Sequence, residues 1–316
     1  MALHATGHPA PLARPGQRSA LRRALGLNAV LLLGEVVGGL AFGSLALIAD
    51  AGHMLADVLG LAVALAGVIL SARPMTRGHS YGFARAEVLA AQVSALLLLA
   101  GGVWVTVEAW SRLTSPESGR VDATGLMAVA SAGVVINLIS AVMVHRAEGE
   151  SLNMRASVVH LATDAVGSVA ALCAGALIWA FGWGWADSAA SMLIAVIVVG
   201  AGVRLLAQST HILMEGTPAG LDADEVRAAI GGVAGVAGVH HLHLWNLASD
   251  LSACSAHVVV AGTPSLAQAQ RVGGLVRAVL DERFGIRNAT LELEDEGVLE
   301  VGVGASPSQT TDSERK

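Results

Sequence analysis

The sequence predicts an α-helical membrane protein, in which a bundle of six transmembrane helices is followed by a small α+β domain. Three observations lead to this prediction: 54% of the 316 residues are hydrophobic, only 14% are charged, and the mean hydropathy is +0.62. Water-soluble globular proteins carry about 25% charged residues, so an ordinary soluble enzyme is excluded. Intrinsic disorder is also excluded, because a chain this apolar has ample surface to bury.

Charge and cysteine content exclude two further classes of protein. The formal net charge of −6 provides no broad basic surface, so no nucleic-acid partner is expected. The chain has 2 cysteines, Cys173 and Cys254, which are too few for a disulfide framework or for a zinc module built from cysteines.

Six apolar runs have roughly the 20 residues that a helix needs to cross about 30 Å of hydrocarbon. They lie at residues 24–42, 45–71, 88–110, 123–144, 158–179 and 186–206. We expect a flexible N-terminal arm over residues 1–18 and the transmembrane domain over residues 19–208.

The distribution of arginine orients these spans. An even number of spans puts both termini on the same side of the membrane. The N-terminal arm and the loops after the second and fourth spans contain nine arginines, whereas the opposite loops contain two, Arg112 and Arg120. The nine are Arg14, Arg18, Arg22, Arg23, Arg73, Arg77, Arg85, Arg146 and Arg155. Because basic residues concentrate in cytoplasmic loops, both termini are expected in the cytoplasm.

Charged residues return after the last span, and residues 209–298 form a second predicted domain. Hydrophobic periodicity predicts a helix at 222–230, strands at 239–247 and 255–260, a helix at 265–284 and a strand at 289–294. The order αββαβ is compatible with a ferredoxin-like layer of helices on a sheet. The polar residues 299–316 are expected to form a disordered tail.

Two of the apolar spans each contain a histidine and an aspartate four residues apart. His53 and Asp57 lie in the second span, and His160 and Asp164 lie in the fifth. This spacing puts both side chains of a pair on one helix face. Each pair alone is compatible with a hydrogen bond within its helix that orders the bundle. The repetition of the same pair on two helices favours a shared ligand set.

Burial of two aspartates in a bilayer requires compensation, because each costs about 2.5–3.5 kcal/mol on insertion scales. Two imidazole nitrogens and two carboxylate oxygens form a closed tetrahedral set that suits a divalent ion such as Zn²⁺. Gly60 and Gly167, one turn beyond the aspartates, would let the two helices approach closely enough to share the ion. Asp50, near the same face, is compatible with a vestibule ligand or with a role at the helix end.

A metal site inside a membrane serves either catalysis or transport. A hydrolytic zinc normally keeps one position open for water, whereas four protein ligands close the coordination sphere, as is typical of cargo. Metal binding needs neutral histidine and ionised aspartate, so protons compete with the metal, which predicts an antiporter rather than an enzyme. The alternatives are a membrane-anchored metal sensor or scaffold without flux, and an intramembrane metalloenzyme.

Five collinear segments carry a more specific signal. They are SLALIADAGHMLADVLG at 44–60, HSYGFARAEVLAA at 79–91, HLATDAVGS at 160–168, LMEGTP at 213–218 and HHLHLW at 240–245. Together and in this order they resemble the cation diffusion facilitator family, most closely its zinc-transporting branch, which includes bacterial zinc, cadmium and cobalt exporters. The resemblance covers roughly residues 21–296.

This resemblance implies a homodimer in the cell membrane. It also implies export of Zn²⁺, with Cd²⁺ and Co²⁺ as alternative substrates, from the cytoplasm by proton-coupled alternating access. It implies a ferredoxin-like cytoplasmic domain after the six helices. The family's transport ligands fall on His53, Asp57, His160 and Asp164, the four residues that the chemistry selects. A histidine at the first of these positions is associated in the family with zinc over cadmium.

The resemblance also implies a second metal site in the cytoplasmic domain, at His240, His257 and Glu294, with Glu292 beside it. The alternative is that these are ordinary residues on the polar face of a sheet. His241 and His243 are expected to alternate with His240 by face. We expect His243 and Trp245 to pack against the core or the partner subunit.

Two further positions follow from the resemblance. Arg85 and Glu215 match a charge pair that links the two domains in relatives, and a generic interfacial ion pair is the alternative. A peripheral metal site of some relatives is matched only at His79, because Thr76 and Phe83 occupy the other positions. No complete site is therefore expected on that loop.

Overall fold

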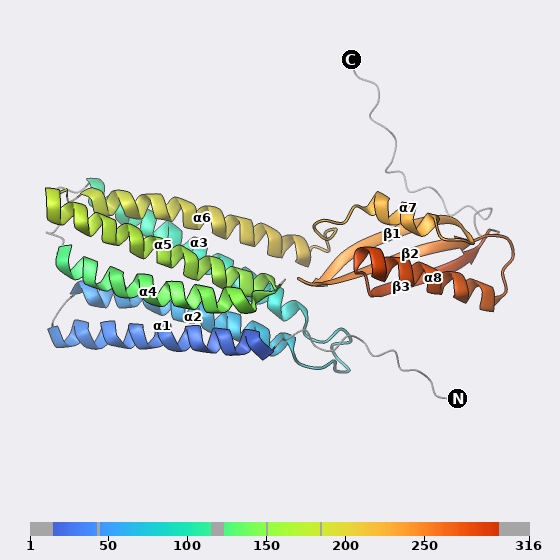
Figure 1. Cartoon of the computed structure of the whole chain (residues 1–316), viewed down its shortest axis with the longest axis horizontal. Coiled ribbons are helices and arrows are strands. Elements are labelled where there is room, and N and C mark those ends of the chain that lie inside the picture. The colour runs from blue at the N-terminus through green and yellow to red at the C-terminus, as the bar shows by residue number, and fades with distance from the viewer. Residues whose placement is uncertain (1–14, 43–44, 115–122, 150, 184, 297–316) are drawn as a thin grey trace, which may run out of the picture. The chain divides into compact units, whose positions relative to one another are not determined.

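A computed structural model describes residues 15–42, 45–114, 123–149, 151–183 and 185–296 (Figure 1). Some side chains within the helices also lie outside the described residues, among them those of His53 and Asp50. The chain divides into two compact units. One comprises the residues up to Met214 with Leu247–Asp250, and the other comprises Glu215–Asn246 and the residues from Leu251 onward. Each unit is described separately below.

Six long helices build the first unit. They are α1 (Pro15–Phe42), α2 (Leu45–Ser71), α3 (Arg85–Thr114), α4 (Ala123–Glu148), α5 (Leu152–Phe181) and α6 (Trp185–Leu213). At 1.5 Å per residue each exceeds the thickness of the hydrocarbon core of a bilayer. Among the described residues, five helices, α2 to α6, are long and apolar enough to cross a membrane. The first predicted span lies in α1, part of whose side chains lie outside the described residues.

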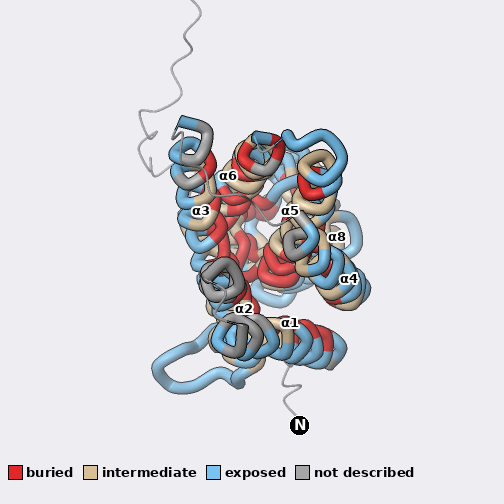
Figure 2. Tube along the Cα trace, turned by 90° about the vertical axis from the view of Figure 1, so that its left-hand side faces the viewer, coloured by how far each residue is buried: buried red, intermediate tan, exposed pale blue. Residues whose placement is uncertain are grey.

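The bundle has two apolar clusters that meet at α5. One cluster includes Leu21 of α1, Leu61 of α2, Val144 of α4 and Leu161 of α5. The other joins α3 and α6 with α5. Figure 2 shows the buried segments facing the interior between the helices and the exposed segments facing outward. Large side chains on that outer surface are apolar, such as Trp104 at 75% exposure, as expected of a surface that contacts lipid.

The helices extend further than the apolar runs that predicted them. Helix α5 begins at Leu152 rather than 158, because Ser151 caps its N-terminus by accepting a hydrogen bond from the Met154 amide. Helix α1 begins at Pro15, inside the range expected to be a flexible arm, and proline is well suited to the first turn of a helix. The rest of that arm, up to residue 14, and the predicted tail from 299 lie outside the described residues.

The second unit has the predicted order αββαβ. Its elements are α7 (Ala223–Gly231), β1 (Val236–Ala248), β2 (Leu251–Val260), α8 (Leu266–Phe284) and β3 (Asn288–Asp295). The sheet order is β1-β2-β3, and β2 pairs parallel with β3 with His257 opposite Glu292. A parallel neighbour needs a crossover, which α8 supplies after a capping box of Ser265 and Gln268.

One face of this sheet packs on both helices. Val226 and Ile230 of α7 and Val276 and Leu280 of α8 are fully buried against the strands. The third strand contributes Leu291 and Leu293 to the same cluster, as expected from their alternation. The glutamates between and after these leucines therefore lie on the opposite face.

Strand β1 departs from the predicted alternation at its histidines. His241 has a φ of 48°, in the left-handed region that non-glycine residues rarely adopt. Val239 and Leu242 both pack on the core, so His240 and His241 between them share the outer face. The prediction that His241 lies on the face opposite His240 is wrong, because the left-handed residue adds a bulge to the strand.

The next histidine of β1 also differs from expectation. His243 is exposed, and neither His243 nor Trp245 belongs to the apolar core of this unit as described. The inward positions of this part of β1 are Leu242 and Leu244, so the core half of the expected packing is not seen among the described residues. Packing of these two side chains on a partner subunit stays a prediction.

Candidate metal centre

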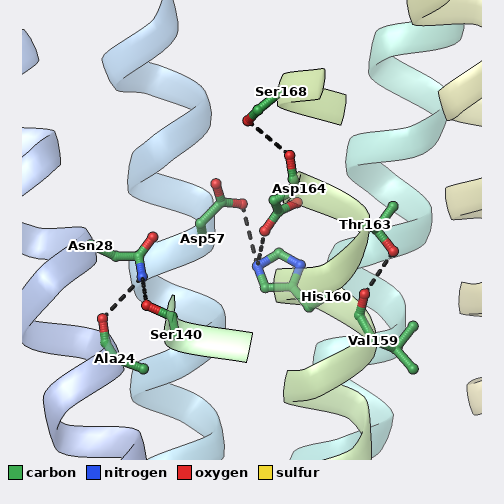
Figure 3. Close-up of polar contacts among 9 residues, drawn as sticks. All are labelled: Ala24, Asn28, Asp57, Ser140, Val159, His160, Thr163, Asp164 and Ser168. Carbon is green, nitrogen blue, oxygen red and sulfur yellow. Dashed lines mark hydrogen bonds and ion pairs between the residues drawn. The ribbon is translucent and has the colours of Figure 1, made fainter. Parts of the chain in front are cut away.

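Helices α2 and α5 bring three of the four predicted membrane ligands together. Nε2 of His160 lies 3.3 Å from Oδ1 of Asp57 on α2 and 3.6 Å from Oδ2 of Asp164 on its own helix (Figure 3). Asp57 is 4% exposed. One oxygen from each carboxylate and one imidazole nitrogen lie within 4.8 Å of one another, a separation that one metal ion can span.

The fourth predicted ligand, His53, lies in α2 one turn before Asp57, and its side chain lies outside the described residues. The same holds for Asp50. The described part of the site therefore contributes one imidazole and two carboxylates. This nitrogen and oxygen donor set suits a divalent cation such as Zn²⁺.

The electrostatics of the cluster favour a cation. Two carboxylates from different helices converge on one imidazole in an apolar bundle, where an uncompensated charge is costly. Nδ1 of His160 is also buried, and it has no hydrogen-bond partner within the described part of the chain. A divalent cation would compensate the two carboxylates and leave one imidazole nitrogen in a direct bond to the ion.

The two flanking glycines have different neighbours. A Cβ built on Gly60 would lie 3.7 Å from Nε2 of His160, in ordinary van der Waals contact, so only a side chain larger than alanine would enter the site. Gly167 instead faces Ile194 of α6, 3.8 Å from a built Cβ. The expectation that Gly167 brings α5 close to α2 is wrong, because it lies on the α6 side of its helix.

Sequence reasoning missed a polar residue that joins the same two helices. Nδ2 of the fully buried Asn153 donates a hydrogen bond of 2.7 Å to the carbonyl oxygen of Ala64. Asn153 precedes His160 by seven residues and Ala64 follows Asp57 by seven residues, so the bond lies two turns from the metal ligands. The signal was present as this seven-residue spacing, but the expected span began at 158. Asn153 fixes how α2 and α5 face each other.

Close packing around Asn153 adds to this alignment. A Cβ on Gly67 of α2 would lie 3.1 Å from Nδ2 of Asn153 and only 2.4 Å from Cβ of Ala90 on α3. Asn28 of α1 and Ser140 of α4 form a further buried polar contact, 3.4 Å long (Figure 3). The helices that surround the metal ligands are thus joined by specific polar contacts as well as by apolar packing.

The predicted residues of the second unit also meet. Oε2 of Glu294 lies 2.8 Å from Nε2 of His240, and its Oε1 lies 2.6 Å from Nδ1 of His257. Glu292 approaches the other nitrogen of His257 at 3.4 Å. Partial burial raises the pKa of Glu294, but hydrogen bonds from His257 and His240 outweigh it and hold the pKa below its usual value. The carboxylate stays ionised and available to a cation.

The remaining candidates belong to none of the metal-ligating groups among the described residues. His79 stacks on Phe83 with ring centroids 4.3 Å apart, and no group of three metal-ligating side chains among the described residues includes it. Arg85 begins α3 and Glu215 belongs to the other unit. Their charge pair stays a prediction.

Long apolar helices with an imidazole and two carboxylates clustered between them define the class: this is a multi-pass membrane protein. Residues 21–214 match the family model described as the cation efflux transmembrane domain. Residues 218–296 match the cation efflux protein cytoplasmic domain. The chain belongs to the cation efflux family, the cation diffusion facilitators that its sequence resembles.

Individual relatives agree with this membership. The chain is 37% identical over 294 residues to the metal cation efflux system protein CzcD of Cupriavidus metallidurans, covering 92% of this chain and 89% of that protein. It is 35% identical over 264 residues to the cadmium, cobalt and zinc/H(+)-K(+) antiporter of Bacillus subtilis, covering 83% and 84%. It is 40% identical over 224 residues to zinc transporter ZitB of Escherichia coli, covering 70% and 71%.

Proposed function

We propose that this protein exports divalent metal cations, Zn²⁺ first among them, from the cytoplasm in exchange for protons. The ion is held by His53, Asp57, His160 and Asp164. The observation that carries the proposal is the convergence of Asp57 and Asp164, from two helices, on one nitrogen of His160. The names of three relatives, a metal cation efflux protein, a cadmium, cobalt and zinc antiporter and a zinc transporter, support the same activity.

The ligand chemistry supplies the coupling. Each carboxylate binds metal only when ionised and each imidazole only when its ligating nitrogen carries no proton, so protons and metal compete for the same atoms. His160 lies within reach of both carboxylates. Protons bound to these ligand atoms would offset the carboxylate charge in the metal's place, and a metal ion must displace them. Alternating exposure of such a site converts a proton gradient into metal export.

The charge pattern and the second domain indicate the membrane orientation of the protein. The arginine-rich N-terminal arm and loops favour a cytoplasmic location for both termini, in the plasma membrane. The match of residues 218–296 to the family's cytoplasmic domain supports that side for the second unit. We expect a homodimer in the lipid bilayer, as the resemblance to the family implies.

The second unit provides a further proposed site. His240, His257 and Glu294 converge within hydrogen-bonding distance, and their donor set fits Zn²⁺. An ion bound there would cross-link β1, β2 and β3, the three strands of one sheet. It would act as a structural or regulatory ion, distinct from the transported one.

Reconstituted protein tests the proposed transport directly. Proteoliposomes with an imposed pH gradient are supplied with Zn²⁺, Cd²⁺ or Co²⁺, and both metal and proton movement are followed with fluorescent indicators. We expect Zn²⁺ flux that is driven by an opposing proton gradient. Tight metal binding without flux would contradict the transporter and favour a sensor.

A further inference from the structure

The outer face of the small sheet carries more metal-ligating side chains than the proposed site uses. Five such side chains gather there, which we call the histidine face: His240, His241, His257, Glu292 and Glu294. His240, His241 and His257 supply three nitrogens within 4.8 Å of one another. The helices cover the other face of the sheet. His241 is the member of this set that neither the strand alternation nor the family resemblance selects.

Resting on the proposed binding of a divalent ion at His240 and His257, we propose that His241 is a third imidazole ligand of that site. Its left-handed backbone brings it there. In a regular strand a residue between His240 and Leu242 would face the core, since successive side chains alternate. The φ of 48° at His241 turns its side chain to the outer face instead.

The three imidazoles are arranged as a triangle. The ring centroids are 5.0 Å apart for His240 and His241, 5.0 Å for His240 and His257, and 4.9 Å for His241 and His257. Each ring therefore contacts both of the others. Zinc–nitrogen bonds of about 2.0–2.1 Å place two tetrahedral ligand nitrogens roughly 3.3 Å apart. Rings at these separations reach a common ion through small rotations.

The hydrogen bonds identify which atom His240 offers. Its Nε2 lies 2.8 Å from Oε2 of Glu294, and a carboxylate in that position accepts the N–H of a ligating histidine and leaves the other nitrogen for the metal. That other nitrogen, Nδ1, lies 2.7 Å from Nδ1 of His241. With no ion between them, His241 donates its Nδ1–H to His240. When a metal ion binds between the two Nδ1 atoms, His241 changes to its other tautomer: the proton leaves Nδ1, and Nε2 carries one instead.

The ligand set determines the class of ion. In this arrangement Glu294 accepts the N–H of His240 instead of binding the ion itself, so its role differs from that of the direct ligand in the three-residue site. The three imidazoles are softer donors than an all-oxygen site, so they favour Zn²⁺, Co²⁺ or Ni²⁺ over Mg²⁺ or Ca²⁺. The same set without His241 has one imidazole fewer and a greater share of oxygen. His241 therefore contributes both affinity and discrimination against the abundant hard cations.

Metal titration of the full-length protein in detergent tests the proposal. The background variant carries Asp57→Asn and Asp164→Asn, so that the membrane ligands are disabled. Asparagine tolerates the left-handed conformation better than most residues, so His241→Asn removes the imidazole and retains the backbone. His243→Asn is the matched control, because His243 is exposed on the same strand and belongs to none of the metal-ligating groups among the described residues. Zn²⁺ affinity is measured by calorimetry and coordination by the visible absorption of bound Co²⁺.

We expect His241→Asn to weaken Zn²⁺ binding at least tenfold and to change the Co²⁺ spectrum, while His243→Asn stays within twofold of the background variant. His241→Gly, which also accommodates the backbone, should behave like His241→Asn. If His240→Asn weakens binding and His241→Asn does not, His241 is no ligand although the site itself stands. If the background variant binds no Zn²⁺, both the site and the role of His241 are refuted, and the transport proposal is unaffected.

Discussion

Replacing Asp57 with asparagine separates two effects of the buried carboxylate: the stability that its burial costs without metal, and the metal affinity that it provides. The substitution preserves size and removes one negative charge at a side chain that is 4% exposed and 3.3 Å from Nε2 of His160. A carboxylate in the bilayer interior costs about 2.5–3.5 kcal/mol on insertion scales. Without metal, Asp57→Asn should therefore be at least as heat-stable as the natural protein.

Bound Zn²⁺ should reverse this order of heat stability, because the natural protein binds the ion more tightly than Asp57→Asn does. Loss of a hydrogen-bond partner behind a metal ligand weakens metal affinity by about 10–100-fold, so loss of a direct ligand should reach at least about 100-fold, or about 2.7 kcal/mol. With the proposed cytoplasmic site removed by His240→Asn and His257→Asn in both proteins, zinc at 100 times its dissociation constant should stabilise the protein that keeps Asp57 by about 2.7 kcal/mol. The same zinc concentration should stabilise Asp57→Asn by well under 1 kcal/mol.

The assay is thermal unfolding in detergent with and without Zn²⁺, paired with Zn²⁺ flux into proteoliposomes. Ser168→Ala is the control, because Ser168 lies one turn from Asp164 and donates only to a carbonyl of its own helix. The control should keep both the zinc-induced shift and the flux. A variant Asp57→Asn with natural flux and a full zinc-induced shift would refute the role of this carboxylate.

Three other predictions follow from the geometry of the two units. Asn153→Ala removes the 2.7 Å bond to Ala64; it should destabilise the bundle by about 1–3 kcal/mol and weaken metal binding, measured by thermal unfolding and calorimetry. Gly60→Ala should bind metal within a few-fold of natural affinity because its Cβ meets Nε2 of His160 at 3.7 Å, whereas Gly60→Val should block binding. The lowered pKa of Glu294 contributes stability at neutral pH that is lost as the pH falls below about 4.5. Glu294→Gln should flatten that acid dependence, as followed by circular dichroism.

These three predictions fail on distinct outcomes. Natural metal affinity in Asn153→Ala would mean that the bond to α2 does not align the ligands. Natural affinity in Gly60→Val would show that the ion does not sit beside this glycine. An unchanged acid transition in Glu294→Gln would show that the carboxylate contributes nothing to the pH dependence of the metal-free domain.

The sequence predicted the architecture well because its signals are strong and local. Apolar runs of membrane-spanning length have few alternatives. The order of the small domain followed from hydrophobic periodicity, and the helix predicted at 265–284 is α8, capped by Ser265. Helix ends were less predictable. The apolar pattern of the fifth span begins at 158, whereas the hydrogen-bonding residue that starts the helix, Ser151, lies in a polar stretch.

The candidate sites were predictable where helix periodicity places the ligands. Spacing i,i+4 put His160 and Asp164 on one face, and the structure has both near Asp57. Periodicity failed where one backbone angle changed. No local residue type signalled that His241 would adopt a positive φ, since glycine is the usual signal for that conformation. The orientation of Gly167 toward α6 depends on helix rotation, which spacing within one helix does not determine.

The coordination of the transported ion is measured most directly by zinc X-ray absorption on the full-length protein. The variant used carries His240→Asn and His257→Asn, so that one equivalent of Zn²⁺ occupies only the membrane ligands. We expect two imidazole nitrogens and two carboxylate oxygens at about 2.0–2.2 Å. A six-coordinate shell of oxygens, without the outer-shell scattering of imidazole, would contradict the account.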